Sequence, residues 1–214
     1  MQPGKRITLG IVKGLLRIHS LSYRLAGYLS IRVENDRLHP KHRIMNYHKF
    51  FVDNVNENDV VLDVGCGNGA LSYDVVKKAK KVVGIDLNEK NISFAKRRYS
   101  RENIEYICGD VLNDLPDEKF DVVIMSNVLE HIERRVEILK NLKEKAPTLL
   151  LRVPMINRDW IILYMKELGV DSRSDKGHYV EYTLESFEEE LRKAGLNIQD
   201  YSIQFGERWA VIGD

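Results

Sequence analysis

From about residue 59 onward, short apolar runs alternate with longer amphipathic segments, and this pattern restricts the fold more than any other feature. The apolar runs lack a strict two-residue alternation, which is typical of strands buried on both faces. Strands that alternate with helices form right-handed βαβ units and therefore a parallel sheet. The predicted strands cover residues 60–64, 81–86, 104–108, 120–126 and 148–153, and the predicted helices cover 69–80, 88–100 and 130–145.

The last thirty residues follow a different pattern. A helix is predicted over 184–194, with Thr183 as its N-cap and Gly195 as its C-terminal stop. Two further strands, 197–205 and 208–213, are joined only by Gly206-Glu207. So short a link permits a hairpin and excludes a parallel crossover. We therefore expect an α/β fold, a Rossmann-like three-layer sandwich whose mostly parallel sheet has an antiparallel last strand.

Residues 1–33 differ from the rest of the chain in charge. They carry a formal charge of +6 and no acidic residue, whereas the remaining chain carries −5. A helix is predicted over 8–30, with Lys13, Arg17 and Arg24 on one face and a broad apolar side. We expect residues 1–40 to form a basic amphipathic extension and 41–214 to form the main domain, with a helix around 41–54. The extension is interpreted as a lid, as a contact between two copies in a homodimer, or as a peripheral membrane contact.

Composition narrows the classes of function. A net charge of +1 gives no global electrostatic reason to bind nucleic acid. The two cysteines, Cys66 and Cys108, form no disulfide scaffold, and a cytoplasmic setting is expected, with the inner membrane face as an alternative. No run of 18 uncharged apolar residues predicts a membrane span, and the charges in 1–33 disfavour a secretory signal.

A glycine-rich loop, DVGCGNG over residues 63–69, follows the first predicted strand and opens the next helix. In open parallel sheets, ligands bind at this edge, beyond the carboxyl ends of the strands. The loop also satisfies a dinucleotide fingerprint through Gly65, Gly67 and Ala70. However, Gly69 lies only two residues after Gly67, and Asp63 would repel a pyrophosphate but accept a hydrogen bond from an ammonium group.

Further polar residues follow the later strands. Asp86 ends the second strand, where an acid is suited to bind ribose hydroxyls. Asp110 follows the third strand and could accept from an adenine amino group, and Asn127 and the pair Glu130-His131 follow the fourth. These acids favour a cationic ligand that carries ribose and adenine over a pyrophosphate.

With these motifs, the chain resembles the class I S-adenosylmethionine-dependent methyltransferases over roughly residues 40–214. The segments VLDVGCGNG, GIDLN, ICGDV and FDVVIMSNVLEHI are similar to the motifs of that family. The resemblance implies a seven-stranded sheet, S-adenosylmethionine as cofactor and S-adenosylhomocysteine as product. Within the family, the chain is most similar to the small-molecule branch that includes quinone and sugar-unit methyltransferases.

The resemblance also implies a set of cofactor contacts: Asp63, Gly65, Cys66, Gly67, Asn68, Gly69, Asp86, Leu87, Asp110, Val111 and Asn127. Residues before the first strand reach the cofactor carboxylate in this family, and His42, Arg43 and Tyr47 are the candidates here. From the residues alone, the two cysteines are interpreted as small buried side chains.

Two histidines are candidate general bases. His178 lies in a segment, GHYVEY, that would sit over the transferred methyl group, and His131 follows the fourth strand. Imidazole is a suitable base near neutral pH. For both residues a structural or positioning role remains an alternative. The sequence predicts no metal site.

The principal hypothesis is O-methylation of a sugar or glycan unit, a small-molecule acceptor. It rests on the insertion over 154–182, which mixes aromatic residues with both signs of charge. A solvated cover over the site is the alternative interpretation of that insertion. Methylation of a quinone or other lipid precursor is the second hypothesis, and a non-catalytic S-adenosylmethionine-binding regulator is the third. Nucleic-acid acceptors are disfavoured.

Overall fold

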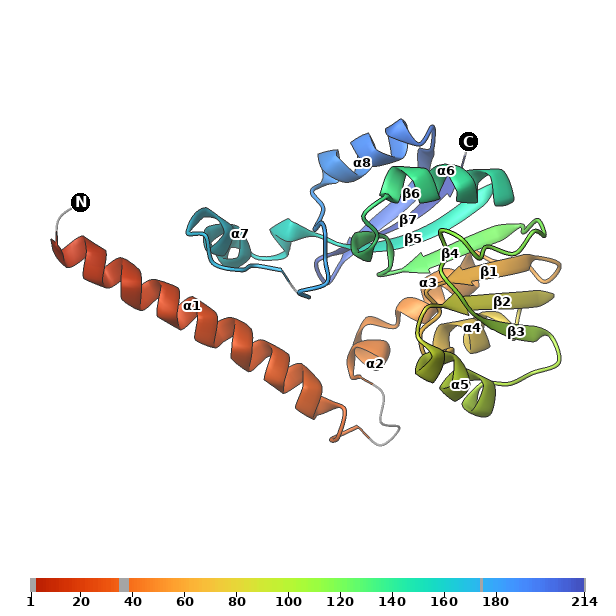
Figure 1. The fold of residues 1–214 in the computed structure, drawn as a ribbon, viewed down its shortest axis with the longest axis horizontal. Coiled ribbons are helices and arrows are strands. Elements are labelled where there is room, and N and C mark those ends of the chain that lie inside the picture. Colours follow the sequence, from red (N-terminus) through yellow and green to blue (C-terminus); the bar gives the residue numbers. More distant parts are fainter. Residues whose placement is uncertain (1–2, 35–38, 174, 214) are drawn as a thin grey trace. The chain divides into compact units, whose positions relative to one another are not determined.

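A computed structural model describes residues 3–34, 39–173 and 175–213. Its centre is a seven-stranded sheet with the order β3-β2-β1-β4-β5-β7-β6 (Figure 1). The strands are β1 (Val60–Val64), β2 (Lys81–Asp86), β3 (Ile104–Cys108), β4 (Val122–Ser126), β5 (Thr148–Pro154), β6 (Asn197–Gln204) and β7 (Glu207–Gly213). Strands β1 to β5 pair in parallel, and β7 is antiparallel to both β5 and β6. The predicted α/β fold class is confirmed.

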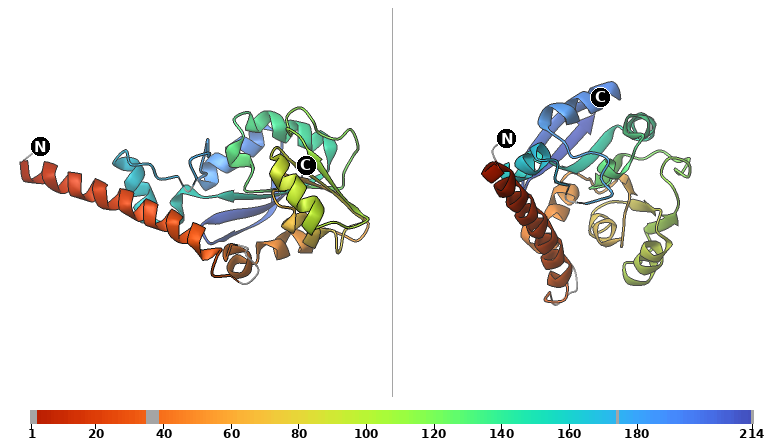
Figure 2. Two further views of the ribbon diagram at one scale, coloured as in Figure 1. Left: turned by 60° about the horizontal axis from the view of Figure 1, so that its bottom comes forward. Right: turned by 60° about the vertical axis from the view of Figure 1, so that its left-hand side comes forward.

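Helices cover both faces of this sheet, which explains why its central strands are apolar on both sides. In the views of Figures 1 and 2, α3 (Tyr47–Asp53), α4 (Ala70–Val75) and α5 (Glu89–Arg98) lie on one face. On the other face lie α6 (Arg135–Lys145) and α8 (Leu184–Lys193). The main apolar core lies between this second pair and the sheet, and it includes Leu62, Val123 and Leu151 of the central strands, which are fully buried.

Two helices are shorter than the apolar pattern predicted. The helix expected over 69–80 ends at Val75 as α4, and the chain continues in turns. The helix expected over 130–145 is interrupted: a single 3₁₀ turn, Leu129–His131, precedes α6, which begins at Arg135. His131 therefore lies on a short turn beside the carboxyl end of β4 rather than on a long helix.

The hairpin that ends the chain turns one residue earlier than predicted. Phe205 and Gly206 form the turn, and both have positive φ, 52° and 74°. Two consecutive residues with positive φ are the mark of the hairpin turns whose twist matches that of the paired strands. Glu207, expected in the link, is instead the first residue of β7. The N-cap at Thr183 is confirmed, because its side chain accepts from the backbone N–H of Ser186.

The helix predicted around 41–54 is divided in two. Asn46 has φ 47°, the left-handed conformation, and separates α2 (Lys41–Met45) from α3. Asparagine tolerates this conformation better than most residues. The break also separates two compact units of the chain.

One unit comprises Met1–Asn46 and Ile156–Lys176, and the other comprises Tyr47–Met155 and Gly177–Asp214. The first unit contains α1 (Pro3–Ser30), α2, the short turn Ile156–Arg158 and α7 (Trp160–Glu167). In it, Leu16 of α1 packs against Met165 and Val170. The division expected from the sequence, 1–40 and 41–214, remains a prediction.

Within the ranges that the structure describes, none of the helices combines the length and the apolar character needed to cross a bilayer.

Candidate functional site

The sheet order reverses direction between β1 and β4, which lie side by side although β2 and β3 come between them in sequence. Such a switch point opens a crevice at the carboxyl ends of the strands. A cavity of about 530 Å³ lies there. Its walls are formed by Val64, Gly65, Ile85, Asp86, Leu87, Gly109, Asp110, Val111, Leu112, Asn127, Val128, His131, Ile132, Glu133, Arg134 and Tyr179.

The glycine loop after β1 needs its glycines for two separate reasons. Gly65, Gly67 and Gly69 all have positive φ, at 66°, 55° and 83°. In addition, a Cβ at Gly65 would lie 2.4 Å from Val128 Cγ2, and one at Gly69 would lie 2.7 Å from the Tyr106 hydroxyl. A side chain at Gly65 or Gly69 would therefore collide with the residues packed against the loop. Gly65 lies on the cavity wall.

Asp86 connects this loop to the end of β2. Its Oδ2 accepts from the backbone N–H of Gly67 at 2.9 Å, and its Oδ1 accepts from the backbone N–H of Asn88 at 2.8 Å. Oδ1 also accepts from Asn91 Nδ2 at 3.3 Å. An ionised carboxylate has about four acceptor positions, so Oδ2 can still accept from a ligand. Asp86 is thus held in a fixed orientation at the cavity, as a ribose-binding acid requires.

Asp110 and Asp63 occupy different positions. Asp110 lines the cavity, and its carboxylate also accepts from the backbone N–H of Leu112 at 2.9 Å. Asp63 is only 1% exposed, and the Ser72 hydroxyl donates to its Oδ2 at 2.5 Å. Burial raises the pKa of Asp63 to about 7. Asp63 therefore has a structural contact, since its hydrogen bond with Ser72 joins the end of β1 to α4, and Asp63 does not line the cavity.

Asn127 also lines the cavity and directly follows β4, which pairs with β1 on the side away from β2; its φ is 55°. Its Nδ2 donates to Glu207 Oε1 at 3.2 Å, and Glu207 in turn receives two hydrogen bonds from the buried Arg152. The Arg152 guanidinium carbon lies 3.7 Å from the centre of the Tyr47 ring. Asn127 Oδ1 is buried and has no hydrogen-bond partner among the residues that the structure describes. A ligand donor would satisfy this atom.

The other predicted cofactor residues are placed as follows. Burial raises the pKa of Tyr47 to about 12, so its hydroxyl keeps its proton. Cys66 is buried as expected, whereas Cys108 is exposed, so the prediction that both cysteines are buried is wrong for Cys108. Asn68 Oδ1 accepts from the backbone N–H of Ala70 at the start of α4. Arg43 belongs to the first unit, together with His42, and pairs with Glu34 at 2.9 Å.

The two candidate bases lie together. The rings of His131 and His178 are 4.6 Å apart between centroids, and edge-on. His131 is exposed and lines the cavity, whereas His178 is 7% exposed. Behind them, Glu181 Oε1 lies 3.3 Å from His178 Nδ1. His131 is therefore the histidine that reaches the cavity, and His178 lies between it and a carboxylate.

Glu130 is fully buried beside these histidines. Neither of its carboxylate oxygens has a hydrogen-bond partner among the described residues, and burial raises the pKa of Glu130 to about 8. One ligand atom each of Glu130, His131 and His178 lies within 4.8 Å of the others. This is a donor set that could hold a divalent cation, and no metal site was predicted from the sequence.

Sequence reasoning missed three residues that support the site: Arg152, Glu181 and Glu207. Arg152 did carry a signal, because it is a single charge within the otherwise apolar strand Leu149–Val153. A charge in such a strand requires a buried partner. That partner, Glu207, was expected in a turn and is instead opposite Pro154 in the β5–β7 ladder.

The cavity combines the buried Asn127 Oδ1, which lacks a partner among the described residues, with the carboxylates of Asp86 and Asp110 and a close backbone approach at Gly65. This set fits a ligand with an adenosine portion and a cationic centre. Leu87 and Val111 add apolar walls suited to the adenine ring.

Comparisons with known proteins agree with this geometry. A family model described as "Methyltransferase domain" matches residues 62–145. A ubiquinone biosynthesis O-methyltransferase of Bradyrhizobium diazoefficiens is 35% identical over 117 residues, 52% of this chain and 45% of that protein. A probable cobalt-precorrin-6B C(15)-methyltransferase of Methanococcus maripaludis is 36% identical over 93 residues, 42% of this chain and 51% of that protein. The chain thus spans about half the length of these curated relatives.

A solved structure shares the fold. Magnesium protoporphyrin IX methyltransferase from Synechocystis, with bound S-adenosylhomocysteine, has a TM-score of 0.62 and 21% identity. The match covers 81% of this chain and 82% of that one.

Proposed function

We propose that this chain, whose residues 62–145 form a methyltransferase domain within the class I fold, methylates a ring hydroxyl of a small acceptor with S-adenosylmethionine. The observation that carries the proposal is the 530 Å³ cavity at the β1/β4 switch point, whose walls include both Asp86 and His131. The family match and the neighbour with bound S-adenosylhomocysteine support this cofactor.

The residues that would hold the cofactor are those already at the cavity. Asp86 would accept from the ribose hydroxyls, and Asp110 from the adenine amino group. Gly65 and Asn127 would face the amino-acid part. When bound, the cofactor supplies an activated methyl group on a sulfonium, so the protein has little covalent chemistry to perform.

The chain's main task is then to align the acceptor and to remove one proton. The imidazole of His131 would accept the proton of the acceptor hydroxyl as the methyl group that the cofactor supplies is transferred to that oxygen. Glu181 and His178, behind that ring, would fix its orientation and stabilise the charge that it gains. Positioning of this kind accounts for effective molarities of about 10⁵–10⁸ M in well-oriented reactions.

A phenolic precursor of a quinone is the acceptor class that we favour. A phenol has a pKa near that of tyrosine, about 10, so an imidazole can take its proton more readily than that of an aliphatic alcohol. The apolar walls at Val128 and Ile132, with Tyr179 nearby, suit a flat aromatic ring. The relative named for ubiquinone biosynthesis supports the same class.

The sugar acceptor expected first has less support. That expectation rested on the insertion over 154–182, but most of its polar and aromatic residues belong to the unit that contains α1. Of the insertion, Tyr179 lines the cavity. Sugar O-methylation therefore remains a prediction that the same experiment tests.

The experiment is methyl transfer from radiolabelled S-adenosylmethionine into an extract of the source cell, followed by partition between organic and aqueous phases. We expect label in the organic phase with the native chain and none with an Asp86→Ala variant. Label confined to aqueous sugars would replace the phenolic acceptor with the sugar one. S-adenosylhomocysteine binding without any transferred label would indicate a non-catalytic binding protein and overturn the proposal.

A further inference from the structure

Helix α1 exposes a continuous row of aliphatic side chains. Successive members are three or four residues apart and so share one face of the helix. We call this row the apolar stripe, and it consists of Ile7, Ile11, Leu15, Ile18, Leu21, Leu25 and Leu29. The exposed fraction of each member lies between 43% and 67%. Seven large aliphatic residues in one row exceed the scattered apolar exposure that is normal for a protein surface.

The stripe is not the face with which α1 packs within its own unit. Leu16, only 6% exposed, contacts the group formed by Met165 and Val170, and Val12 packs against the same group. Figures 1 and 2 show α1 passing beside α7 in this unit. At 100° per residue, Leu16 and Val12 lie on the side of the helix away from Ile18. The helix therefore has two apolar faces, one packed and one exposed.

Cations lie between these two faces. Arg6, Lys13, Arg17 and Arg24 fall within about 40° of one another around the helix axis, on the flank next to the stripe. No acidic residue occurs in Pro3–Ser30. An apolar face with a flanking row of cations is the pattern of helices that lie in the plane of a membrane surface.

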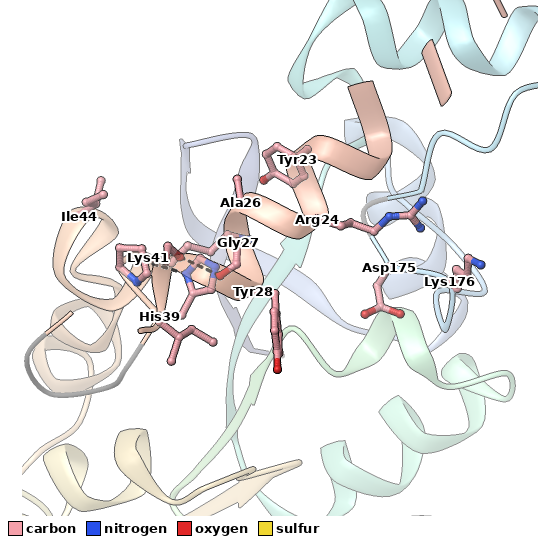
Figure 3. A pocket seen from close by; sticks show the side chains of 13 residues that line it. Tyr23, Arg24, Ala26, Gly27, Tyr28, His39, Lys41, Ile44, Asp175 and Lys176 are labelled. Atoms are coloured by element: carbon pink, nitrogen blue, oxygen red, sulfur yellow. Dashed lines mark hydrogen bonds between the residues drawn. The ribbon is translucent and has the colours of Figure 1, made fainter. Parts of the chain in front are cut away.

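The same unit gathers more positive charge around a cavity of about 730 Å³ at the C-terminal end of α1. Arg24, Lys41 and Lys176 line it, with Asp175 as its acidic residue, and Tyr23 and Tyr28 add aromatic rings (Figure 3). The positive potential of the unit thus extends beyond the helix itself.

The charge of α1 favours a lipid surface over a second copy of the chain as the partner of the apolar stripe. If α1 packed against α1 of a second copy, each helix would bring five cations and no anion to the contact, and the like charges would repel. An anionic lipid surface offers both an apolar interior and an attractive potential, of about 1 kcal/mol per Lys or Arg near the surface. We propose that α1 docks in the plane of an anionic lipid bilayer, with the apolar stripe among the acyl chains and the cation row at the headgroups.

The test is flotation of the full chain with two kinds of vesicle, phosphatidylcholine alone and phosphatidylcholine with phosphatidylglycerol. No cofactor and no acceptor is present, so the result is independent of the proposed methyl transfer. We expect the chain to float with the anionic vesicles and not with the neutral ones, and to be released in part by salt. Equal binding to both vesicles, or to neither, would overturn the proposal.

Variants then locate the contact. The double variant Ile11→Glu, Ile18→Glu should weaken binding by about 10²-fold or more, because both side chains leave the acyl region and become charged. Arg6→Gln with Arg17→Gln should weaken it by about 25-fold. The control is Ile203→Glu on β6, where the side chain is 50% exposed and the substitution adds one negative charge, as each substitution of the double variant does. It should bind as the native chain does.

Circular dichroism and urea unfolding establish that each variant is folded, and light scattering reports its oligomeric state. A double variant that floats like the native chain would show that the stripe is not the contact. A native chain that self-associates and does not float, together with a monomeric double variant, would assign the stripe to an interface between copies and overturn the membrane proposal.

Discussion

The ring of His131 lies edge-on to the ring of His178, with centroids 4.6 Å apart. Only His131 reaches the cavity wall, whereas the 7%-exposed His178 lies behind it with Glu181 at 3.3 Å. The order Glu181, His178, His131 leads from a buried carboxylate to the cavity. Of the two candidate bases named from the sequence, His131 is the one that lies on the cavity wall.

Replacing His131 by glutamine should reduce methyl transfer by about 10²–10⁴-fold, the usual contribution of a general base. Binding of S-adenosylhomocysteine should change little, because Asp86 and the glycine loop are untouched. The measurement is label transfer in the extract assay together with calorimetric titration of S-adenosylhomocysteine. Unchanged transfer would remove His131 from the role of base.

Replacing Glu181 by glutamine should lower turnover by about tenfold, less than the His131 change, because Glu181 contacts His178 and does not line the cavity itself. The maximal rate should fall while the acceptor KM stays constant. Glu189→Gln, an exposed acid on α8, is the control with the same loss of charge. An equal loss in both variants, or a rise in KM alone, would contradict a positioning role.

Asp86→Asn should weaken S-adenosylhomocysteine binding by about 10–100-fold, which corresponds to the loss of one or two charge-assisted hydrogen bonds. The amide offers only one oxygen, so it cannot accept from both Gly67 and Asn88 and still accept from ribose. Asp117→Asn, a fully exposed acid, should leave the dissociation constant unchanged. Titration calorimetry distinguishes the two, and equal affinities for all three proteins would disprove the ribose role.

Glu130 predicts how stability depends on pH. Its pKa is raised from 4.5 to about 8, chiefly by burial, so the folded chain keeps a proton that the unfolded chain loses above about pH 4.5. The unfolding free energy should therefore fall as pH rises from about 5 to 8, with a contribution of at most about 1.4 kcal/mol per pH unit from this group.

Glutamine has no such proton, so Glu130→Gln should become more stable relative to the native chain as the pH rises through that range. Urea unfolding at several pH values gives the difference. Glu137→Gln, half exposed on α6, should show a difference that does not vary with pH. A constant difference for Glu130→Gln as well would mean that Glu130 ionises normally in the folded state.

Gly65→Ala should destabilise the fold by about 2 kcal/mol and weaken cofactor binding. The φ of 66° is unfavourable for alanine, and the new Cβ would lie 2.4 Å from the stiff Val128 side chain. Gly10→Ala is the control, because its Cβ would meet nothing within 4 Å and helix propensity should stabilise it by about 0.5–1 kcal/mol. Urea unfolding measures the free energy of unfolding of both variants, which should fall for Gly65→Ala and rise for Gly10→Ala.

The sequence predicted the strands well because their apolar runs leave few alternatives, and β1, β2 and β3 begin and end where expected. It also predicted the polar residues at the strand ends, since parallel strands bring these ends to one edge. It could not predict the break before α6, because the apolar period continues through Ile132 and Val136. The break arises from the backbone conformation of the residues between the 3₁₀ turn and α6, which the pattern of apolar residues does not reveal.

The Arg152–Glu207 contact and the grouping of residues 156–176 with α1 could not be predicted for a different reason. The contact of Arg152 with Glu207 depends on the register between β5 and β7, which the sequence does not specify. The grouping of residues 156–176 with α1 depends on Leu16 meeting Met165, two residues that are far apart in sequence. Such long-range pairings follow from the packing of the whole chain.

The strand order β3-β2-β1-β4 has a consequence for how the chain assembles. Strands β2 and β3 come between β1 and β4 in the sequence, so the β1–β4 pairing beside the cavity is a long-range contact that exists only in the assembled sheet. A ligand in the cavity binds only the assembled state, and at a concentration 100 times its dissociation constant it adds about 2.7 kcal/mol to global stability. Amide hydrogens of β1 and β4 that exchange through global opening should then slow together, by about 100-fold, so that ligand occupancy can be read from exchange at backbone sites the ligand never contacts.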